Sequence, residues 1–345
     1  MSVSPALSPC FSAAPRLRPR GFHSGPHRSG GRAIDLRHEA PMLSVLSRVR
    51  QNAVVVALAL STITLFPGHD ALASTCTYPE LPIAPRPDYL SPDTVVLTFD
   101  DGPDLSNTPE VLDILKQEGI HAAFFINTAT RDVLVDAPPG TPGRDEARAL
   151  VRRIVEEGHE LGNHTVHHLH LPQLSPAEIH EELGGLERTV SEILGTCGPK
   201  LTLVRAPYGE PYWFAPDDPT IPKVTSALRE HGVHVGWSID TKDYRCSEGD
   251  AGCVYDRVVR ELDAGNYGVI LMHSVHSQTV LALPRIVAEL RHRHMKFATV
   301  EEAVRARYGR SSAELVSNPT ACPLRAPAAE TSLSGDPPSA DPDCG

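Results

Sequence analysis

The chain has no surplus of positive charge. Its 32 lysine and arginine residues are outnumbered by 43 aspartate and glutamate residues, which gives a formal net charge of −11. Because proteins that bind nucleic acids by neutralising phosphates need clustered Lys and Arg, this balance argues against a nucleic-acid partner. No internal repeat is visible, and 41% hydrophobic with 22% charged residues is typical of an ordinary globular protein.

Long apolar runs are also scarce. The run at residues 53–66 falls short of the roughly 20 apolar residues that span a bilayer. It follows Arg48 and Arg50 and precedes the small-residue sequence Ala-Leu-Ala at 71–73, so residues 42–73 are typical of a secretory signal. We therefore expect export to the periplasm, cell envelope or extracellular space, with no membrane span in the mature form. The alternative is an uncleaved membrane anchor.

The first segment lacks any hydrophobic period. Residues 1–41 are rich in Arg, Pro, Gly, Ser and His, so they cannot bury enough apolar surface to offset their chain entropy. We expect a disordered basic extension, or a mis-annotated start with Met42 as the true first residue.

None of the seven cysteines has metal-site spacing. Leaving out Cys10, which lies in the first segment, an even set remains: Cys76, Cys197, Cys246, Cys253, Cys322 and Cys344. An even set in an exported chain is consistent with disulfides. Cys246 and Cys253 bracket a short polar loop and are the expected pair, with free thiols as the alternative.

What the chain does have is a regular alternation of short apolar runs and amphipathic segments of helical length. The predicted strands are residues 95–99, 122–126, 160–163, 201–204, 234–239, 268–272 and 296–299. The predicted helices are residues 109–118, 144–157, 176–194, 222–231, 254–264, 279–294 and 300–307. This alternation predicts an α/β protein with a mostly parallel sheet, either a barrel, complete or not, or an open sheet.

Two adjacent carboxylates follow the first predicted strand. They are Asp100 and Asp101, in the sequence TFDDGP at residues 98–103. Neighbouring anions repel, so the pair is stable mainly when a cation neutralises one carboxylate and leaves the other able to take a proton. This pattern indicates a metal ligand beside a general base.

A histidine pair forms the second constellation. His164 and His168, in HTVHH, are four residues apart, and on a helical turn this spacing puts both imidazoles on one face. With Asp101 they would complete a two-histidine, one-carboxylate set with positions open for water and substrate. His167 and His170 would then point elsewhere. Because the chain has 17 histidines, such spacing also arises by chance, and the alternative is a polar helix start with solvated side chains.

Three more polar groups follow predicted strands. Arg205, in RAPYG, could orient a carboxylate by a two-pronged hydrogen bond. Asp240 and Asp243 lie in DTKDY, and His273 ends the apolar sequence LMH, where a lone histidine could equally be an ordinary hydrogen-bonding residue. Active sites of βα folds form at the carboxyl ends of the strands, and all of these groups fall at or just past such ends. Their common position favours a single active site.

The ordered motifs TFDDGP, HTVHH, RAPYG, DTKDY and LMH resemble the polysaccharide deacetylase family, the NodB-homology or carbohydrate esterase family 4 domain. The resemblance covers residues 93–308, which leaves a linker at 74–92 and a Pro/Ala-rich tail at 309–345 that is held by a disulfide or mobile. It implies a distorted (β/α) barrel of about seven parallel strands. It also implies hydrolysis of N-acetyl groups from N-acetylglucosamine polymers such as peptidoglycan or chitin.

The resemblance also implies the roles of the reacting residues. Asp101, His164 and His168 would hold a divalent metal, commonly zinc and in some members cobalt or another transition ion. Asp100 would be the general base and His273 the general acid.

Further residues are implied around them. Arg205 would position the base and Asp243 would tune the acid histidine. The residues implied at the substrate are Pro207, Tyr208, Trp237 and Tyr244. Tyr244 departs from the family pattern, which usually has Trp there, and Ser274 stands where Asp or Asn is frequent.

Two loops interrupt the alternation, at residues 136–143 and 210–219, and are expected to reshape the cleft. The second carries Tyr212, Trp213 and Phe214, which would either line a sugar-binding groove or pin the loop to the body.

Three rival functions remain beside an exported polysaccharide N-deacetylase. An acetyl-xylan esterase would use the same site on an ester bond. A carbohydrate-binding protein with an inactive site is a second alternative. A metallopeptidase is disfavoured, because no Glu lies between His164 and His168 to act as base.

Overall fold

The computed structural model describes residues 79–195 and 198–318. The predicted extension and signal sequence lie outside the described residues, as do Cys76, Cys197, Cys322 and Cys344. Within the two described segments, none of the helices combines the length and the apolar character that crossing a bilayer requires.

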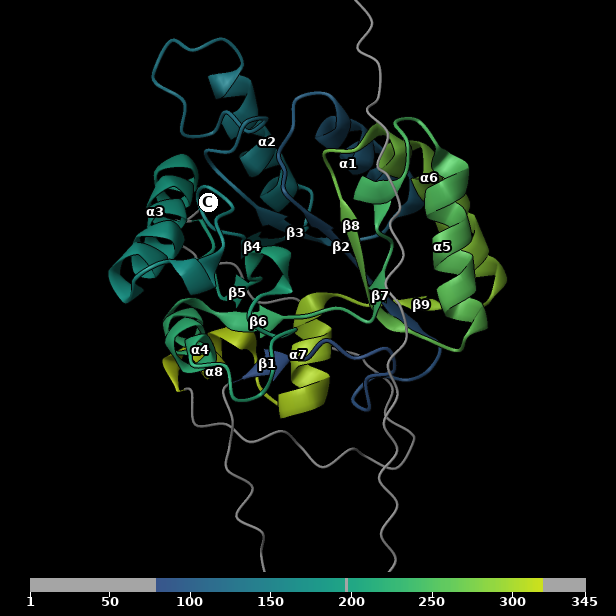
Figure 1. Cartoon of the computed structure of the whole chain (residues 1–345). Coiled ribbons are helices and arrows are strands. Elements are labelled where there is room, and N and C mark those ends of the chain that lie inside the picture. The colour runs from purple at the N-terminus through teal and green to yellow at the C-terminus, as the bar shows by residue number, and fades with distance from the viewer. Residues whose placement is uncertain (1–78, 196–197, 319–345) are drawn as a thin grey trace, which may run out of the picture. The chain divides into compact units, whose positions relative to one another are not determined.

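The described segments form one parallel sheet with helices around it (Figure 1). The strand order is β1-β6-β5-β4-β3-β2-β8-β7, with β9 paired to β2 as well. The strands are β1 Glu80–Leu81, β2 Thr94–Asp100, β3 Ala123–Ile126, β4 Glu160–Asn163, β5 Leu203–Val204, β6 Val233–Val235, β7 Ile239–Asp240, β8 Gly268–His273 and β9 Lys296–Phe297. The sheet curls into an incomplete barrel that runs from β1 to β7, which confirms the predicted distorted (β/α) barrel.

The helices alternate with the strands along the chain. They are α1 Asn107–Glu118, α2 Arg144–Glu156, α3 Pro176–Leu194, α4 Thr220–His231, α5 Ala251–Asp263, α6 Ser277–His292, α7 Val300–Tyr308 and α8 Ser312–Ser317. Single 3-10 turns, η1 Leu171–Gln173, η2 Pro207–Gly209 and η3 Asp243–Arg245, lie in the connections. In Figure 1, α3 lies at one side of the sheet and α5 and α6 lie together at the other.

The core explains which face of β2 carries the chemistry. Every residue of β2 is buried, and its side chains alternate between two apolar clusters. Leu97 and Phe99 belong to the cluster that contains side chains of α1, α2 and α6, whereas Val96 belongs to the one that contains side chains of α7. Because side chains alternate with a period of two, Thr98 and Asp100 share the inner face with Val96.

The predicted strand at residues 234–239 is wrong in one respect, because the structure divides it into β6 and β7. The division falls at Gly236, whose amide donates to the Leu81 carbonyl at 2.6 Å. A Cβ at Gly236 would come within 2.8 Å of the backbone of Pro82 and Ile83, so only glycine fits this crossing. Beyond it, the amide of Ser238 donates to the carbonyl of Val269, and the chain continues against β8.

One strand and one α-helix were not predicted. Strand β1 is only two residues long and pairs with β6, so it leaves no periodic signal. Helix α8 begins within the segment predicted to be an unstructured or disulfide-held tail. Its start is a capping box, in which the Ser311 hydroxyl accepts from the Glu314 amide and the Glu314 carboxylate accepts from the Ser311 amide.

The predicted disulfide is confirmed. Cys246 and Cys253 are bonded, with their Cα atoms 5.8 Å apart. The bond joins the end of η3 to the first turn of α5 and therefore ties down the segment that follows Asp243.

Candidate metal centre and active site

Asp101 leaves β2 and turns its carboxylate toward two histidines. Its backbone is left-handed, with φ of 71°, and its amide donates to the Phe125 carbonyl of β3. Its Oδ1 atom lies 3.4 Å from Nε2 of His164 and 3.3 Å from Nε2 of His168. This oxygen is buried and has no hydrogen-bond partner, which is unusual for a carboxylate oxygen.

The two histidines converge as predicted, but not by the predicted helical turn. Residues 164–168 form a loop, with left-handed backbone at Thr165 (φ 71°) and His168 (φ 56°). The side-chain amide of Asn127 donates to the carbonyls of His164 and Thr165, and the Thr165 hydroxyl accepts from the backbone amide of His168. These bonds fold the loop so that the two imidazole centroids are 4.9 Å apart.

Each ring is held ready to bind a cation. Nδ1 of His164 lies 2.7 Å from the Arg205 carbonyl, which can only accept, so Nδ1 carries a proton and Nε2 is the nitrogen that faces Asp101. Burial and the neighbouring His164 lower the pKa of His168 to about 4, so its ring is neutral. Although burial opposes ionisation of Asp101, the histidines around it, His164 foremost, lower its pKa. Two imidazole nitrogens and a carboxylate whose buried oxygen has no hydrogen-bond partner therefore fit a divalent metal ion.

Asp100 is buried beside this centre and paired with an arginine. One guanidinium nitrogen of Arg205 lies 2.6 Å from Asp100 Oδ1 and 2.9 Å from the Thr98 hydroxyl. The other nitrogens donate to the carbonyls of Val235 and Gly236. Arg205 is wholly buried, and burial lowers its pKa although Asp100 opposes the shift. The second oxygen of Asp100 lies 3.7 Å from Nε2 of His164, so it faces the metal centre.

His273 is the last residue of β8 and also faces Asp101. Its Nδ1 lies 2.6 Å from Asp243 Oδ1, and its amide donates to Asp243 Oδ2. Burial disfavours the imidazolium, but the carboxylates, Asp243 foremost, outweigh burial and raise the pKa of His273 to about 10. The same contacts lower the pKa of Asp243 in spite of its burial. Nε2 of His273 lies 3.9 Å from Asp101 Oδ2, so this proton faces the metal centre.

Comparison with known proteins identifies the domain that holds these residues. Residues 88–235 match the family model described as polysaccharide deacetylase. The chain carries a polysaccharide deacetylase domain.

Two curated relatives are deacetylases by name. The peptidoglycan-N-acetylglucosamine deacetylase of Listeria monocytogenes is 30% identical over 231 residues, which are 67% of this chain and 42% of that protein. The chitin deacetylase of Arthroderma benhamiae is 32% identical over 213 residues, 61% of this chain and 52% of that protein. The chain thus spans about half the length of these relatives.

A solved structure has the same fold. The chitin deacetylase from the fungal pathogen Colletotrichum lindemuthianum aligns with a TM-score of 0.51 and 29% identity, covering 66% of this chain and 89% of that one.

The residues predicted at the substrate divide into two kinds. The first kind is exposed: Tyr208 and Tyr244 are each 48% exposed to solvent. Tyr208 lies against His168, with centroids 4.5 Å apart, and Tyr244 lies edge-on to His273 at 5.6 Å. Pro207 is buried, and Trp237 is only 7% exposed, so their side chains support the site from beneath.

His167 and His170 point away from the centre, as predicted. His167 pairs with Glu182, and His170 pairs with Glu210 while its ring stacks on Tyr208 at 3.9 Å.

Several supporting residues were not predicted. The Thr279 hydroxyl donates to Asp243 Oδ2 at 2.6 Å, and the Gln278 side chain donates to the Asp243 carbonyl. Both come from the first turn of α6, and threonine or glutamine in a helix carries no sequence signal of such a contact. His276, just before α6, joins Asp243 and His273 in a second group with metal-ligand spacing.

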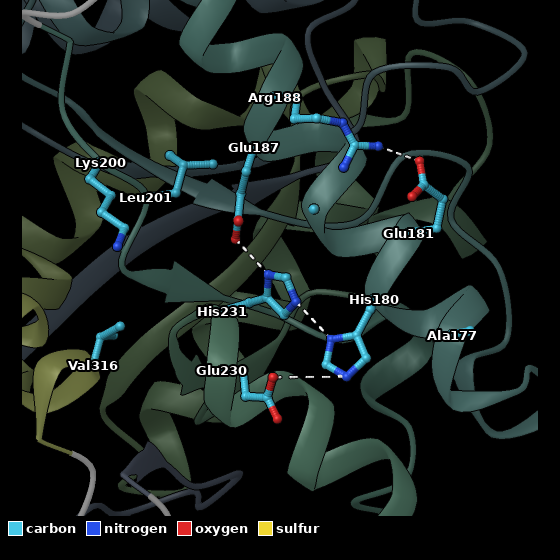
Figure 2. A pocket seen from close by; sticks show the side chains of 11 residues that line it. Ala177, His180, Glu181, Glu187, Arg188, Lys200, Leu201, Glu230, His231 and Val316 are labelled. Atoms are coloured by element: carbon cyan, nitrogen blue, oxygen red, sulfur yellow. Dashed lines mark hydrogen bonds and ion pairs between the residues drawn. The ribbon is translucent and has the colours of Figure 1, made fainter.

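A separate hollow of about 460 Å³ lies between α3 and α4 (Figure 2). His231 lies at its centre, with Nδ1 against Glu187 at 2.9 Å and Nε2 against His180 at 3.1 Å. Lys200 lines the same hollow. None of the residues predicted for the reaction lines it.

Proposed function

We propose that this protein is a metal-dependent hydrolase that removes acetyl groups from N-acetylglucosamine residues of a polysaccharide, such as peptidoglycan or chitin. The names of the curated relatives support an N-acetyl substrate. The arrangement of carboxylates and histidines at the carboxyl ends of β2, β4 and β8 supports the chemistry.

Asp101, His164 and His168 would hold the divalent cation, zinc in the first instance or cobalt. A bound ion of this kind would polarise the acetyl carbonyl and lower the pKa of a nearby water.

Asp100 is the proposed general base. Its free oxygen faces the metal centre while Arg205 holds the other, so it is oriented to accept a proton from the attacking water. The water oxygen then bonds to the acetyl carbon.

His273 is the proposed general acid. Its raised pKa keeps the imidazolium at neutral pH, and Asp243 orients the ring so that Nε2 presents the proton. Transfer of this proton to the amide nitrogen allows the carbon–nitrogen bond to break, which gives acetate and a free amine. The amide nitrogen of Tyr208 is proposed to bind the developing oxyanion.

One observation carries this proposal. A buried carboxylate paired with arginine and an imidazolium paired with a different carboxylate both face the candidate metal ligands: Asp100 lies 3.7 Å from His164, and His273 lies 3.9 Å from Asp101. An acid and a base held apart by separate partners suit amide hydrolysis, which needs both in one turnover.

Acetate release tests the proposal. The purified protein, supplied with zinc or cobalt, is incubated with N-acetylglucosamine oligomers, peptidoglycan and acetylated xylan. We expect acetate and free amines from at least one amino-sugar substrate, and no release by Asp100→Asn. Release from xylan alone would indicate an O-acetyl esterase, and no release from any substrate would indicate an inactive carbohydrate-binding protein.

We also propose that the protein is exported. Polymers of the cell wall lie outside the cytoplasm, and the predicted signal at residues 42–73 and the Cys246–Cys253 disulfide are consistent with an oxidising compartment.

A further inference from the structure

Exposed aromatic side chains lie beside the metal centre. Among the described residues, six large apolar side chains are exposed, namely Leu105, Leu169, Tyr208, Trp213, Tyr244 and Leu281. Leu169 directly follows His168 in sequence, and the rings of Tyr208 and Tyr244 contact His168 and His273. Such clustering indicates a binding surface. Trp213 is the most exposed of its aromatic members, at 56%.

The indole of Trp213 is held in one orientation although it is exposed. Its Nε1 donates to the Tyr208 carbonyl at 3.0 Å, and its centroid lies 5.5 Å from that of buried Trp237. Gly209 makes this approach possible, because a Cβ there would come within 2.5 Å of both indoles. A fixed, exposed ring loses little conformational entropy when it binds a ligand.

The loop that carries Trp213 is anchored by the preceding residue, Tyr212. The Tyr212 ring stacks on His234 at 4.0 Å and 21°, and His234 is fully buried. The Tyr212 amide donates to the Gly209 carbonyl, and the Phe214 amide donates to the Pro211 carbonyl. The two interpretations of the aromatic loop therefore apply to different residues, because Tyr212 pins the loop and Trp213 is presented to solvent.

We propose that Trp213 is the stacking platform of an additional sugar subsite, which binds a pyranose ring of the polymer beside the residue that reacts. This inference rests on the proposed function. Pyranose rings have flat faces of C–H bonds, which suit the face of an indole. Tyr208 lies between Trp213 and the metal ligand His168, so a chain bound along these rings would place neighbouring sugars on both.

The dependence of kcat/KM on the length of the substrate distinguishes a sugar-binding role of Trp213 from a purely structural one. We compare kcat/KM for the N-acetylglucosamine pentamer and dimer. In Trp213→Ala the ratio of pentamer to dimer should fall about tenfold, mainly through KM for the pentamer. Trp213→Phe keeps a flat ring and should restore most of the ratio. Leu281→Ala, a control of equal exposure on α6, should leave the ratio unchanged.

An equal loss on both oligomers, or no loss on either, would overturn the proposed subsite. Binding is measured separately by calorimetry with the pentamer, in the Asp100→Asn background. We expect Trp213→Ala to weaken this binding about tenfold, and unchanged binding would contradict the proposal. Because this titration needs no turnover, it tests the subsite even if the protein releases no acetate.

Discussion

Asp100 and His273 lie opposite each other in register on the neighbouring parallel strands β2 and β8. Both strands end at this point, so both side chains reach the same edge of the sheet. Their partners come from different elements, because Arg205 follows β5 and Asp243 begins η3. The fold therefore gives two adjacent positions partners of opposite charge, a guanidinium for Asp100 and a carboxylate for His273, and this difference is the basis of the proposed base and acid.

Substitution of the proposed base and substitution of a proposed metal ligand should have different effects on bound metal. Asp100→Asn should retain about one divalent ion per chain and lose 10²–10⁴-fold or more in kcat, because it removes only the proton acceptor. His164→Ala should lose both the ion and turnover. Metal content after dialysis, measured by mass spectrometry beside acetate release, checks both. Loss of metal in Asp100→Asn together with its retention in His164→Ala would contradict the assignment.

The pH dependence of kcat should show the effect of Asp243 on the pKa of His273. The proposed reaction needs protonated His273, whose pKa is raised to about 10, so activity should persist at neutral pH and fall as the pH rises through that value. Asp243→Asn removes the largest of the interactions that raise the pKa of His273, so the alkaline limb of kcat should move to lower pH. Asp240→Asn, a nearby carboxylate that accepts from the Lys242 amide, is the control and should keep the wild-type limb. If the alkaline limb of kcat stays at the same pH in Asp243→Asn, Asp243 does not set the pKa of the general acid.

Arg205 should be costly to remove. Arg205→Ala leaves Asp100 buried without its cation, which should lower the free energy of unfolding by about 3–5 kcal/mol. Arg188→Ala breaks an exposed pair with Glu181 and should cost about 0–1 kcal/mol. Urea unfolding of both variants measures the difference. Equal stabilities would show that the buried pair does not support the site.

The same glycine substitution should have opposite effects at two positions. A Cβ at Gly162, in β4 next to the metal-binding loop, would overlap the ring of Phe125, so Gly162→Ala should destabilise by about 1–3 kcal/mol. Gly184 lies inside α3, where the nearest atom to a Cβ is 3.4 Å away on a flexible arginine. Gly184→Ala should therefore stabilise by about 0.5–1 kcal/mol. Thermal unfolding gives both signs, and destabilisation at Gly184 would refute the packing argument.

The sequence predicted the strand ends well because the motifs carry their own boundaries. The sequence TFDDGP ends an apolar run, and a parallel sheet brings all such ends to one edge. The sequence alone therefore groups Asp100, Asp101, Arg205 and His273 at one site. The boundaries of α3 were also predicted, since Pro176 and the capping box of Ser175 mark its start.

What the sequence could not predict depends on contacts between distant segments. His164 and His168 converge because Asn127 holds the loop, not because the loop is helical. The crossing at Gly236 depends on its close approach to Pro82, and the support of Asp243 by Thr279 depends on where α6 begins. None of these follows from local periodicity.

The central claim is that one cation lies between Asp101, His164 and His168. Crystals of the protein grown with zinc, measured at the zinc absorption edge, test it most directly. We expect an anomalous peak bounded by these three side chains, with the Asp100 carboxylate and the His273 imidazole facing it. A peak found instead at His273, Asp243 and His276, or in the hollow beside His180 and His231, would contradict it.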